Sequence, residues 1–164
     1  GGERDFRERR SPVATASMTG FFVLLYLTIR FKLTALTPEG FIALRSFGLA
    51  LMVLGTLFNI WGRVFLKRNW ADHVRVYSDQ QLVTSGPYRV VRHPLYASLI
   101  WMFFGAALAY LNPLAAVETA ALFIPAMIYR SNLEEQVLTE TFGETYLEYR
   151  ARTGRFLPKP AGRT

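Results

Sequence analysis

The 164-residue sequence contains no cysteine. This absence excludes a disulfide scaffold, a zinc–thiolate site, an iron–sulfur cluster and a catalytic thiol. Charge is also scarce, because charged residues make up 19% of the chain, against about 25% in an ordinary soluble domain. Hydrophobic residues make up 51% of the chain, which excludes a disordered chain and a collagen-like repeat. The length is that of a single domain.

Acidic residues are the scarcer of the two charge types. The chain has 12 Asp and Glu against 19 Lys and Arg, which gives a formal net charge of +7. A basic excess favours an anionic partner, such as nucleic acid, an anionic lipid or an anionic cofactor. The high apolar content favours lipid among these three. We therefore expect contact with membrane lipids and none with nucleic acid.

The apolar residues fall into four blocks, at residues 18–36, 41–61, 95–111 and 113–129. Each of the last three blocks contains at most one charged residue. A soluble amphipathic helix of this length would show one apolar stripe and one polar face, whereas these blocks are apolar on all sides. One small domain cannot bury four such helices from water. The sequence therefore predicts an all-α, multi-pass membrane bundle with about four transmembrane helices.

The connections between the blocks predict the orientation of the bundle. Short turns join the first two blocks, at Thr37–Gly40, and the last two, at Asn112–Pro113. Residues 62–92 and 130–164 are long and polar. Together with residues 4–10 they hold most of the arginines and lysines. Four spans place these three basic segments on one side of the membrane. The positive-inside rule then places that side, with both termini, in the cytoplasm.

The stretch Asn132–Arg152 differs from the four apolar blocks. Its apolar residues are interleaved with five glutamates, which is an amphipathic helical pattern. We expect it to continue the fourth span as a cytoplasmic helical extension. Gly143 is expected to interrupt this helix, and Leu157–Pro160 to end it.

A first polar motif, Arg92-His93-Pro94, directly precedes the third apolar block. Proline is favoured in the first turn of a helix, so Pro94 is expected to begin the third span. His93 would then lie beside unpaired N–H groups at a helix N-terminus, which attract a carboxylate or a phosphate. Arg92 would add a fixed positive charge. The alternative is structural: Arg92 reaches lipid headgroups and His93 caps the helix.

A second polar set consists of Arg130, Glu134 and Glu135. Arg130 and Glu134 are four residues apart, so they share one helix face. An ordinary ion pair at the end of a span is the alternative interpretation. Ionisable groups near bilayer depth are costly, however, and tend to face a cavity. Together with His93, this set is suited to an amino acid headgroup, because a glutamate would bind its ammonium while the histidine binds its carboxylate.

Two stretches carry a resemblance to a known family: LVTSGPYRVVRHPLY at residues 82–96 and EEQVLTETFGETYLEYR at residues 134–150. They resemble the isoprenylcysteine carboxyl methyltransferases and the wider group of small integral-membrane methyltransferases, which includes phospholipid N-methyltransferases. The resemblance covers residues 70–158. It places the cofactor-binding and catalytic region, including two spans, in 70–158. The apolar blocks add two N-terminal spans in 18–61, so residues 1–164 are predicted to form a single integral-membrane methyltransferase domain.

The resemblance implies S-adenosylmethionine as cofactor and S-adenosylhomocysteine as product, bound on the cytoplasmic side beneath the last two spans. It implies no metal site. It assigns cofactor contacts to the segment before the Gly-Pro-Tyr turn, to the tyrosine of that turn, to the His-Pro-x-Tyr stretch and to one glutamate of the tail. These residues are Gln80, Gln81, Leu82, Val83, Tyr88, His93, Pro94, Leu95, Tyr96 and Glu134, with a further contact near His73. Arg130, one helical turn before the glutamate, is assigned to the orientation of the methyl acceptor.

Methyl transfer from a sulfonium is an in-line displacement, for which a protein mainly supplies binding and alignment. A carboxylate acceptor is already ionised, so Arg130 would only hold and aim it. A lipid amine would need a base, for which Glu135 is the candidate. The leading hypothesis is therefore a carboxyl methyltransferase acting on a prenylated cysteine or a similar lipophilic acid. The alternatives are N-methylation of an aminophospholipid or another small lipophile, and a non-enzymatic membrane scaffold.

Overall fold

The computed structural model describes residues 6–8, 12–33, 36, 40–66, 75–77 and 82–160. Within these ranges the regular secondary structure is helical apart from one antiparallel pair of three-residue strands. The prediction of a helical fold is therefore confirmed, and the strand pair is an addition to it. The elements are β1 (Phe6–Glu8), α1 (Pro12–Arg30), α2 (Ile42–Leu66), β2 (Arg75–Tyr77), the 3₁₀ turn η2 (Gly86–Arg89), α3 (Pro94–Ala109), α4 (Pro113–Glu118), the π turn η3 (Thr119–Phe123), α5 (Ile124–Phe142) and α6 (Glu144–Arg152).

The fourth apolar block and the first part of the tail form one continuous helix, Pro113–Phe142, which comprises α4, η3 and α5. Asn112 caps its start, because the side-chain oxygen accepts a 3.1 Å hydrogen bond from the backbone N–H of Ala115. The π turn η3 falls directly before Pro125, which has no N–H to donate to the preceding helical turn. The helix ends at Gly143, whose φ is +54°, and α6 follows at once, as the sequence predicts.

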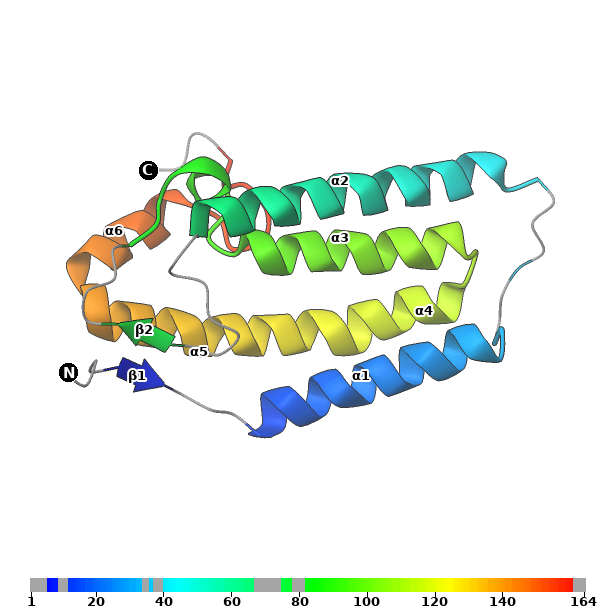
Figure 1. Ribbon diagram of the computed structural model, residues 1–164, viewed down its shortest axis with the longest axis horizontal. Coiled ribbons are helices and arrows are strands. Elements are labelled where there is room, and N and C mark those ends of the chain that lie inside the picture. The colour runs from blue at the N-terminus through cyan, green and yellow to red at the C-terminus, as the bar shows by residue number, and fades with distance from the viewer. Residues whose placement is uncertain are drawn as a thin grey trace.

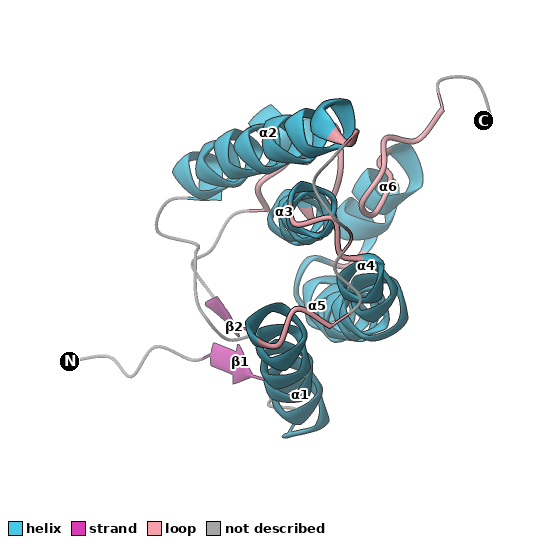
Figure 2. Ribbon diagram, turned by 90° about the vertical axis from the view of Figure 1, so that its right-hand side faces the viewer, coloured by secondary structure: helices cyan, strands magenta, loops and turns pink. Residues whose placement is uncertain are grey.

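The long helices lie side by side and form two packed groups. α2 packs along α3, while α1 packs against α4, η3 and α5 (Figures 1 and 2). The turn between α3 and α4 lies at one end of the bundle, whereas η2, the start of α3 and α6 lie at the other (Figure 1). This second end is called the α6 end below, and it holds a group of paired charged side chains.

Glycines allow α2 and α3 to approach each other closely. Gly48, Gly55 and Gly62 recur along α2, and all three are buried. A Cβ atom at Gly55 would lie 3.0 Å from the carbonyl oxygen of Ser98, and a Cβ atom at Gly105 would lie 2.7 Å from that of Gly48. Small residues on both helices therefore bring the two backbones together. This contact fixes where α3 begins relative to α2.

α1 docks on the rest of the bundle through aromatic rings and one buried polar pair. The ring of Phe21 is 4.9 Å from that of Phe123 and 5.2 Å from that of Phe103, between centroids. Closer to the C-terminus of α1, the Thr28 hydroxyl lies 2.5 Å from the Glu118 carboxyl, and both side chains are buried. The single acidic residue of the fourth apolar block is therefore turned away from the surface and toward α1.

Two helices are long and apolar enough to cross a membrane by length and composition: α2 and the continuous helix Pro113–Phe142. Two more helices are apolar but shorter, at Thr15–Arg30 and Pro94–Ala109. The sequence predicts about four spans. By length and apolar composition, the described helices support two of them. Large apolar side chains along α1 and α2 are exposed, which is unusual for a soluble domain and suits contact with lipid.

α1 and α2 do not end where their apolar blocks end, and α1 begins at Pro12, before its block. α1 ends at Arg30, whereas the first apolar block continues to Leu36, so the predicted extension is wrong. Lys32 has a φ of +49°, a left-handed conformation that cannot continue a right-handed helix. α2, by contrast, continues past the predicted end at Trp61 as far as Leu66.

Candidate functional site

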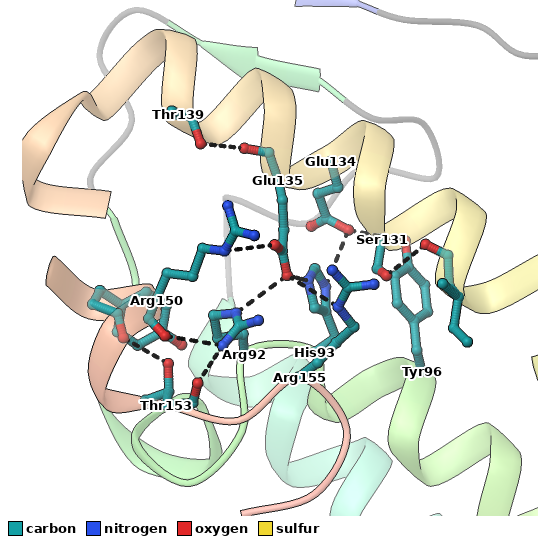
Figure 3. Close-up of polar contacts among 12 residues, drawn as sticks. Arg92, His93, Tyr96, Ser131, Glu134, Glu135, Thr139, Arg150, Thr153 and Arg155 are labelled. Carbon is teal, nitrogen blue, oxygen red and sulfur yellow. Dashed lines mark hydrogen bonds and ion pairs between the residues drawn. The ribbon is translucent and has the colours of Figure 1, made fainter. Parts of the chain in front are cut away.

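The charged side chains at the α6 end come from four segments (Figure 3). Three of these are the turn that follows η2, the second half of α5 and residues Thr153–Phe156 after α6, and the fourth is α6 itself, which carries Arg150. Gly86, with a φ of +59°, begins η2, which confirms the turn predicted there. Pro94 is the first residue of α3 and His93 is its N-cap, as the sequence predicts. The turn thereby delivers Arg92 and His93 to the side of α5.

Glu135 on α5 lies at the centre of this end and is only 4% exposed. Its carboxylate contacts Arg92 at 3.2 Å, His93 at 3.1 Å, Arg150 at 3.4 Å and Arg155 at 3.5 Å, as Figure 3 shows. These five residues are called the Glu135 cluster below. A buried carboxylate is stable only when it is paired and hydrogen-bonded. The Glu135 cluster therefore ties α5 to the turn before α3, to α6 and to the chain after α6.

The chain after α6 is also held through its backbone. Val91 and Gly154 form a parallel bridge, and the backbone N–H of Arg92 donates a 2.8 Å hydrogen bond to the carbonyl oxygen of Gly154. The backbone N–H of His93 donates a 3.1 Å hydrogen bond to the carbonyl oxygen of Arg155. These bonds occupy backbone groups beside the N-terminus of α3 that the sequence left without partners. The segment after α6 is thus bonded through its backbone to the residues that precede α3, and it forms part of this end of the bundle.

Glu134 lies beside the Glu135 cluster and is linked to Arg130 through a tyrosine. The Tyr96 hydroxyl donates a 3.0 Å hydrogen bond to Oε2 of Glu134, and it accepts a 3.1 Å hydrogen bond from Nε of Arg130. His93 Nδ1 lies 3.5 Å from the same Oε2 atom. The ring of Tyr96 stacks on that of His93, with centroids 5.5 Å apart and an interplanar angle of 14°. One phenolic oxygen therefore connects an arginine and a carboxylate.

His93 lies between the two glutamates, and this position sets its charge. Burial of the ring, which is 4% exposed, disfavours the imidazolium. Hydrogen bonds and charge from Glu134 and Glu135 favour it and outweigh the burial, so the pKa of His93 lies above its ordinary value. The histidine is therefore suited to hold both carboxylates as a cation.

This raised pKa predicts how stability depends on pH. A histidine whose pKa is higher in the folded state contributes stability in full below its unfolded pKa of about 6.5, and the contribution is lost as the pH rises through the folded pKa. We expect wild type to be more thermally stable than His93→Gln at pH 6, with a gap that narrows as the pH rises. Melting temperatures of both proteins in the same detergent, from pH 6 to pH 9, measure this. A gap that widens with pH would contradict the assignment.

Three tyrosines pack around the cluster. The Tyr149 hydroxyl donates a 2.6 Å hydrogen bond to the carbonyl oxygen of Tyr88, which ties α6 to η2. Burial, with the charge of Glu134 nearby, raises the pKa of the Tyr88 hydroxyl. The ring of Tyr146 is completely buried, and its hydroxyl has no hydrogen-bond partner among the described residues. The buried tyrosines of α6 therefore attach this helix to the turn before α3.

The side chains of the first polar motif do not make the contacts that its structural alternative requires. The side chain of His93 makes no capping hydrogen bond at α3, because its ring nitrogens contact the two glutamates. The side chain of Arg92 does not reach toward lipid. It is 9% exposed, and it donates to the carbonyl oxygens of Arg150 and Thr153 as well as contacting Glu135.

A sequence profile of the phospholipid methyltransferase family matches residues 44–145, which is more than half of the chain. The chain belongs to the phospholipid methyltransferase family. The matched residues run from α2 into α6. They include Arg92, His93 and Glu135 of the Glu135 cluster, while Arg150 and Arg155 lie just beyond the match.

Individual relatives confirm the resemblance to isoprenylcysteine carboxyl methyltransferases. Protein-S-isoprenylcysteine O-methyltransferase B of Arabidopsis thaliana is 27% identical over 115 residues, which cover 69% of this chain and 58% of that protein. A probable protein-S-isoprenylcysteine O-methyltransferase of Oryza sativa subsp. indica is 28% identical over 163 residues, which cover 93% of this chain and 84% of that protein.

A solved structure shares the fold. It is that of the eukaryotic intramembrane Ras methyltransferase ICMT, an isoprenylcysteine carboxyl methyltransferase, and it is similar with a TM-score of 0.64 at 24% identity. The similarity covers 95% of this chain and 56% of the solved chain. This chain therefore spans little more than half the length of both the Arabidopsis relative and the solved protein.

The structure brings together part of the predicted site. Five of the predicted residues form one connected set: His93, Tyr96, Arg130, Glu134 and Glu135. Tyr88 lies close enough to Glu134 for the charge of that carboxylate to contribute to the raised pKa of the tyrosine. Other predicted residues lie elsewhere. The side chains of Pro94 and Leu95 face Gly62 on α2, Leu82 and Val83 are half-buried before η2, and His73, Gln80 and Gln81 lie outside the described residues.

Three members of the Glu135 cluster were not among the predicted site residues: Arg92, Arg150 and Arg155. Arg92 was identified only as a fixed charge. Arg150 and Arg155 follow no helical spacing to Glu135, so no periodic pattern marks them. The only signal was the concentration of arginine after Glu148, which hydropathy alone assigns to the membrane surface.

Proposed function

We propose that this chain transfers the methyl group of S-adenosylmethionine to the carboxylate of a lipophilic acceptor, such as a prenylated cysteine or a similar lipophilic acid. The observation that carries the proposal is the connection of Glu134 to Arg130 through a single hydroxyl, that of Tyr96. It presents a carboxylate for a cationic donor and a guanidinium for an anionic acceptor within one hydrogen-bonded unit. Membership of the phospholipid methyltransferase family and the names of the relatives support the same reaction class.

Glu134 fits the ammonium group of the donor's methionine part. Its side chain is 34% exposed. Tyr96 and His93 both contact Oε2 of Glu134, whereas none of the described residues forms a hydrogen bond or ion pair with Oε1. A carboxylate that is fixed through one oxygen and open at the other is suited to a charge-assisted hydrogen bond with an ammonium. When bound there, the donor supplies an electrophilic methyl group on a sulfonium.

His93 serves this contact by position. Both of its ring nitrogens are within 3.5 Å of a glutamate carboxylate, so the ring holds Glu134 and Glu135 at a fixed separation. We propose it as a positioning residue for Glu134. This differs from the sequence-based expectation that His93 binds the donor's carboxylate directly. Arg150 and Arg155, whose side chains are 49% and 27% exposed, are better placed for that anionic group.

Arg130 fits the acceptor's carboxylate. Nε is held by Tyr96, and Nη1 lies 3.9 Å from the sulfur of Met18 near the start of α1. The guanidinium of Arg130 thus contacts a polar group, the Tyr96 hydroxyl, and an apolar side chain, that of Met18. Ile128 and Tyr129, immediately before Arg130 on α5, are exposed. An acceptor whose apolar tail lies along this surface would bring its carboxylate to Arg130, which can bind it through two parallel hydrogen bonds.

The reaction needs alignment more than proton transfer. A carboxylate oxygen forms a bond to the methyl carbon while the carbon–sulfur bond breaks, and the electron pair of that bond goes to sulfur. No proton moves, because the carboxylate is already ionised near neutral pH. The contribution of Arg130 and Glu134 is to hold the two reacting groups in line, which is where most of the available rate acceleration lies.

N-methylation of an aminophospholipid is the second candidate, because the matched family is named for phospholipids. It requires a base, and Glu135 was the candidate for it. The carboxylate of Glu135 contacts three arginines and His93, and it is 4% exposed. Such surroundings stabilise the ionised form, so this carboxylate is a weak base. The geometry therefore favours an anionic acceptor over an amine.

We further propose that α1, α2, α3 and the first part of the Pro113–Phe142 helix all span the membrane, with the α6 end in the cytoplasm. The exposed apolar side chains on these helices and the basic residues at the α6 end support this orientation. Cysteine introduced at Ser85 is expected to react with an impermeant reagent only from the cytoplasmic side, and cysteine at Gly40 only from the other side. The reverse pattern would contradict the orientation.

Calorimetric titration of the purified protein with S-adenosylmethionine tests the enzyme proposal against a membrane scaffold. We expect saturable binding with one site per chain. The absence of binding, in a preparation shown by its thermal transition to be folded, would contradict the proposed function.

A further inference from the structure

We propose that Tyr96 couples donor binding to acceptor binding, so that each ligand increases the affinity for the other. This inference rests on the proposed function, because it concerns the same two ligands. The observation behind it is that a single phenolic oxygen donates to Glu134 at 3.0 Å and accepts from Arg130 at 3.1 Å.

The geometry makes this oxygen a fixed link. Tyr96 lies in the first turn of α3, and its ring stacks on the buried ring of His93. His93 is in turn held by Glu135 at 3.1 Å, and through its backbone by Arg155. The hydroxyl therefore cannot follow one partner without losing the other. A change in the hydrogen bonding of Glu134 is therefore transmitted to Arg130 through one shared oxygen atom.

The charges decide the sign of the coupling. Without ligands, the carboxylate of Glu134 offsets part of the positive charge of Arg130 through the Tyr96 hydroxyl. An ammonium bound at Glu134 would take up that negative charge, so Arg130 would attract an anion more strongly. A carboxylate bound at Arg130 would act in the same sense on Glu134 and its cationic ligand. Both effects are favourable, and linkage requires them to be equal.

Methyl transfer would end the coupling. The acceptor's carboxylate becomes a neutral ester, so Arg130 no longer holds an anion and Glu134 no longer gains from one. The reactants are thus held together more strongly than the products. The same link that favours the complete reactant complex would favour release of the methylated acceptor.

The test measures the coupling without turnover. S-adenosylhomocysteine retains the ammonium but has no methyl group to transfer, and N-acetyl-S-farnesylcysteine is a small prenylated acid with a free carboxylate. The dissociation constant of S-adenosylhomocysteine is measured by calorimetry with and without saturating N-acetyl-S-farnesylcysteine. For wild type we expect it to be about fivefold or more lower with the acid present. For Tyr96→Phe, which keeps the ring and its stacking, we expect a ratio close to one.

Tyr110→Phe is the matched control, because Tyr110 is the exposed residue that ends α3, 61% exposed and far from the α6 end. It should keep the wild-type ratio. Glu134→Gln provides a second variant, since it removes the charge at one end of the link, and its ratio should also approach one. A wild-type ratio of one, or an unchanged ratio in Tyr96→Phe, would overturn the coupling while leaving the proposed function intact. Failure of both ligands to bind wild type would instead overturn the proposed function, and this inference with it.

Discussion

Replacing Glu134 with glutamine is expected to weaken the binding of S-adenosylmethionine by about 2–3 kcal/mol, because a hydrogen bond between charged groups is lost while the side chain keeps its size. This corresponds to an increase of roughly 30- to 140-fold in the dissociation constant. Tyr96 can still donate to the amide oxygen of the glutamine, so the local packing should be preserved. Calorimetric titration of wild type and variant in the same detergent measures the difference.

Glu140→Gln is the matched control for this substitution. Glu140 lies on the same helix, it is exposed, and it is not one of the five residues of the Glu135 cluster. The control removes the same charge from α5 and should leave the dissociation constant within twofold of wild type. An unchanged dissociation constant in Glu134→Gln would show that the donor's ammonium binds elsewhere.

Replacing Arg130 with alanine is expected to lower turnover about a hundredfold, because the acceptor's carboxylate is no longer aimed at the methyl group. Donor binding should change far less, since the Tyr96 hydroxyl lies between Arg130 and Glu134. The two effects are separated by measuring kcat with the acceptor and the dissociation constant of the donor on the same preparations. A fall confined to donor affinity would contradict the role of Arg130 in binding the acceptor.

Two further variants sharpen this result. Arg130→Lys keeps the charge but loses the planar fork, so it should recover little of the lost turnover. If Arg130 were only an interfacial anchor, lysine would replace it almost fully, because lysine also extends to the membrane surface. Arg152→Ala removes an arginine whose side chain is 76% exposed and is paired only with Glu148 among the described residues, and it should retain wild-type turnover.

Local sequence signals predicted the parts of the fold that depend on neighbouring residues. Pro94 begins α3, Gly143 separates α5 from α6, and Gly86 begins the turn before α3, each at the predicted position. These residues restrict the backbone by themselves, so no tertiary contact is needed to locate them. The end of α1 at Arg30 was missed, because an apolar run does not reveal where the backbone leaves the helix.

The candidate site was predictable only in part, because many of its contacts join residues that are far apart in the sequence. His93, Arg130 and Glu134 could be identified because they are ionisable groups beside apolar spans. The Glu135 cluster could not be identified in this way. Its arginines lie in the turn before α3, in α6 and in the chain after α6, and these segments meet only in the folded protein. The pairing of Glu134 with Tyr96 likewise joins residues 38 positions apart. Hydropathy and spacing carry no information on such contacts.

The pair β1 and β2 illustrates the same limit outside the site. Phe6–Glu8 belongs to a segment of mixed charge with no alternating apolar pattern, and it pairs with Arg75–Tyr77 from the long loop. Three residues are too few for strand periodicity to be recognised. The pairing brings the N-terminal segment back to the loop that precedes the site.

The most direct test of the account is the identity of the methylated product. Purified protein in phospholipid vesicles is given S-adenosylmethionine with a radiolabelled methyl group and N-acetyl-S-farnesylcysteine, and the product is then treated with alkali. An ester formed on the acid's carboxylate would release labelled methanol, whereas a methylated amine would not. We predict an alkali-labile product with wild type and about a hundredfold less of it with Arg130→Ala. Label that stays alkali-stable in the vesicle lipid, with none released as methanol, would contradict the proposed reaction.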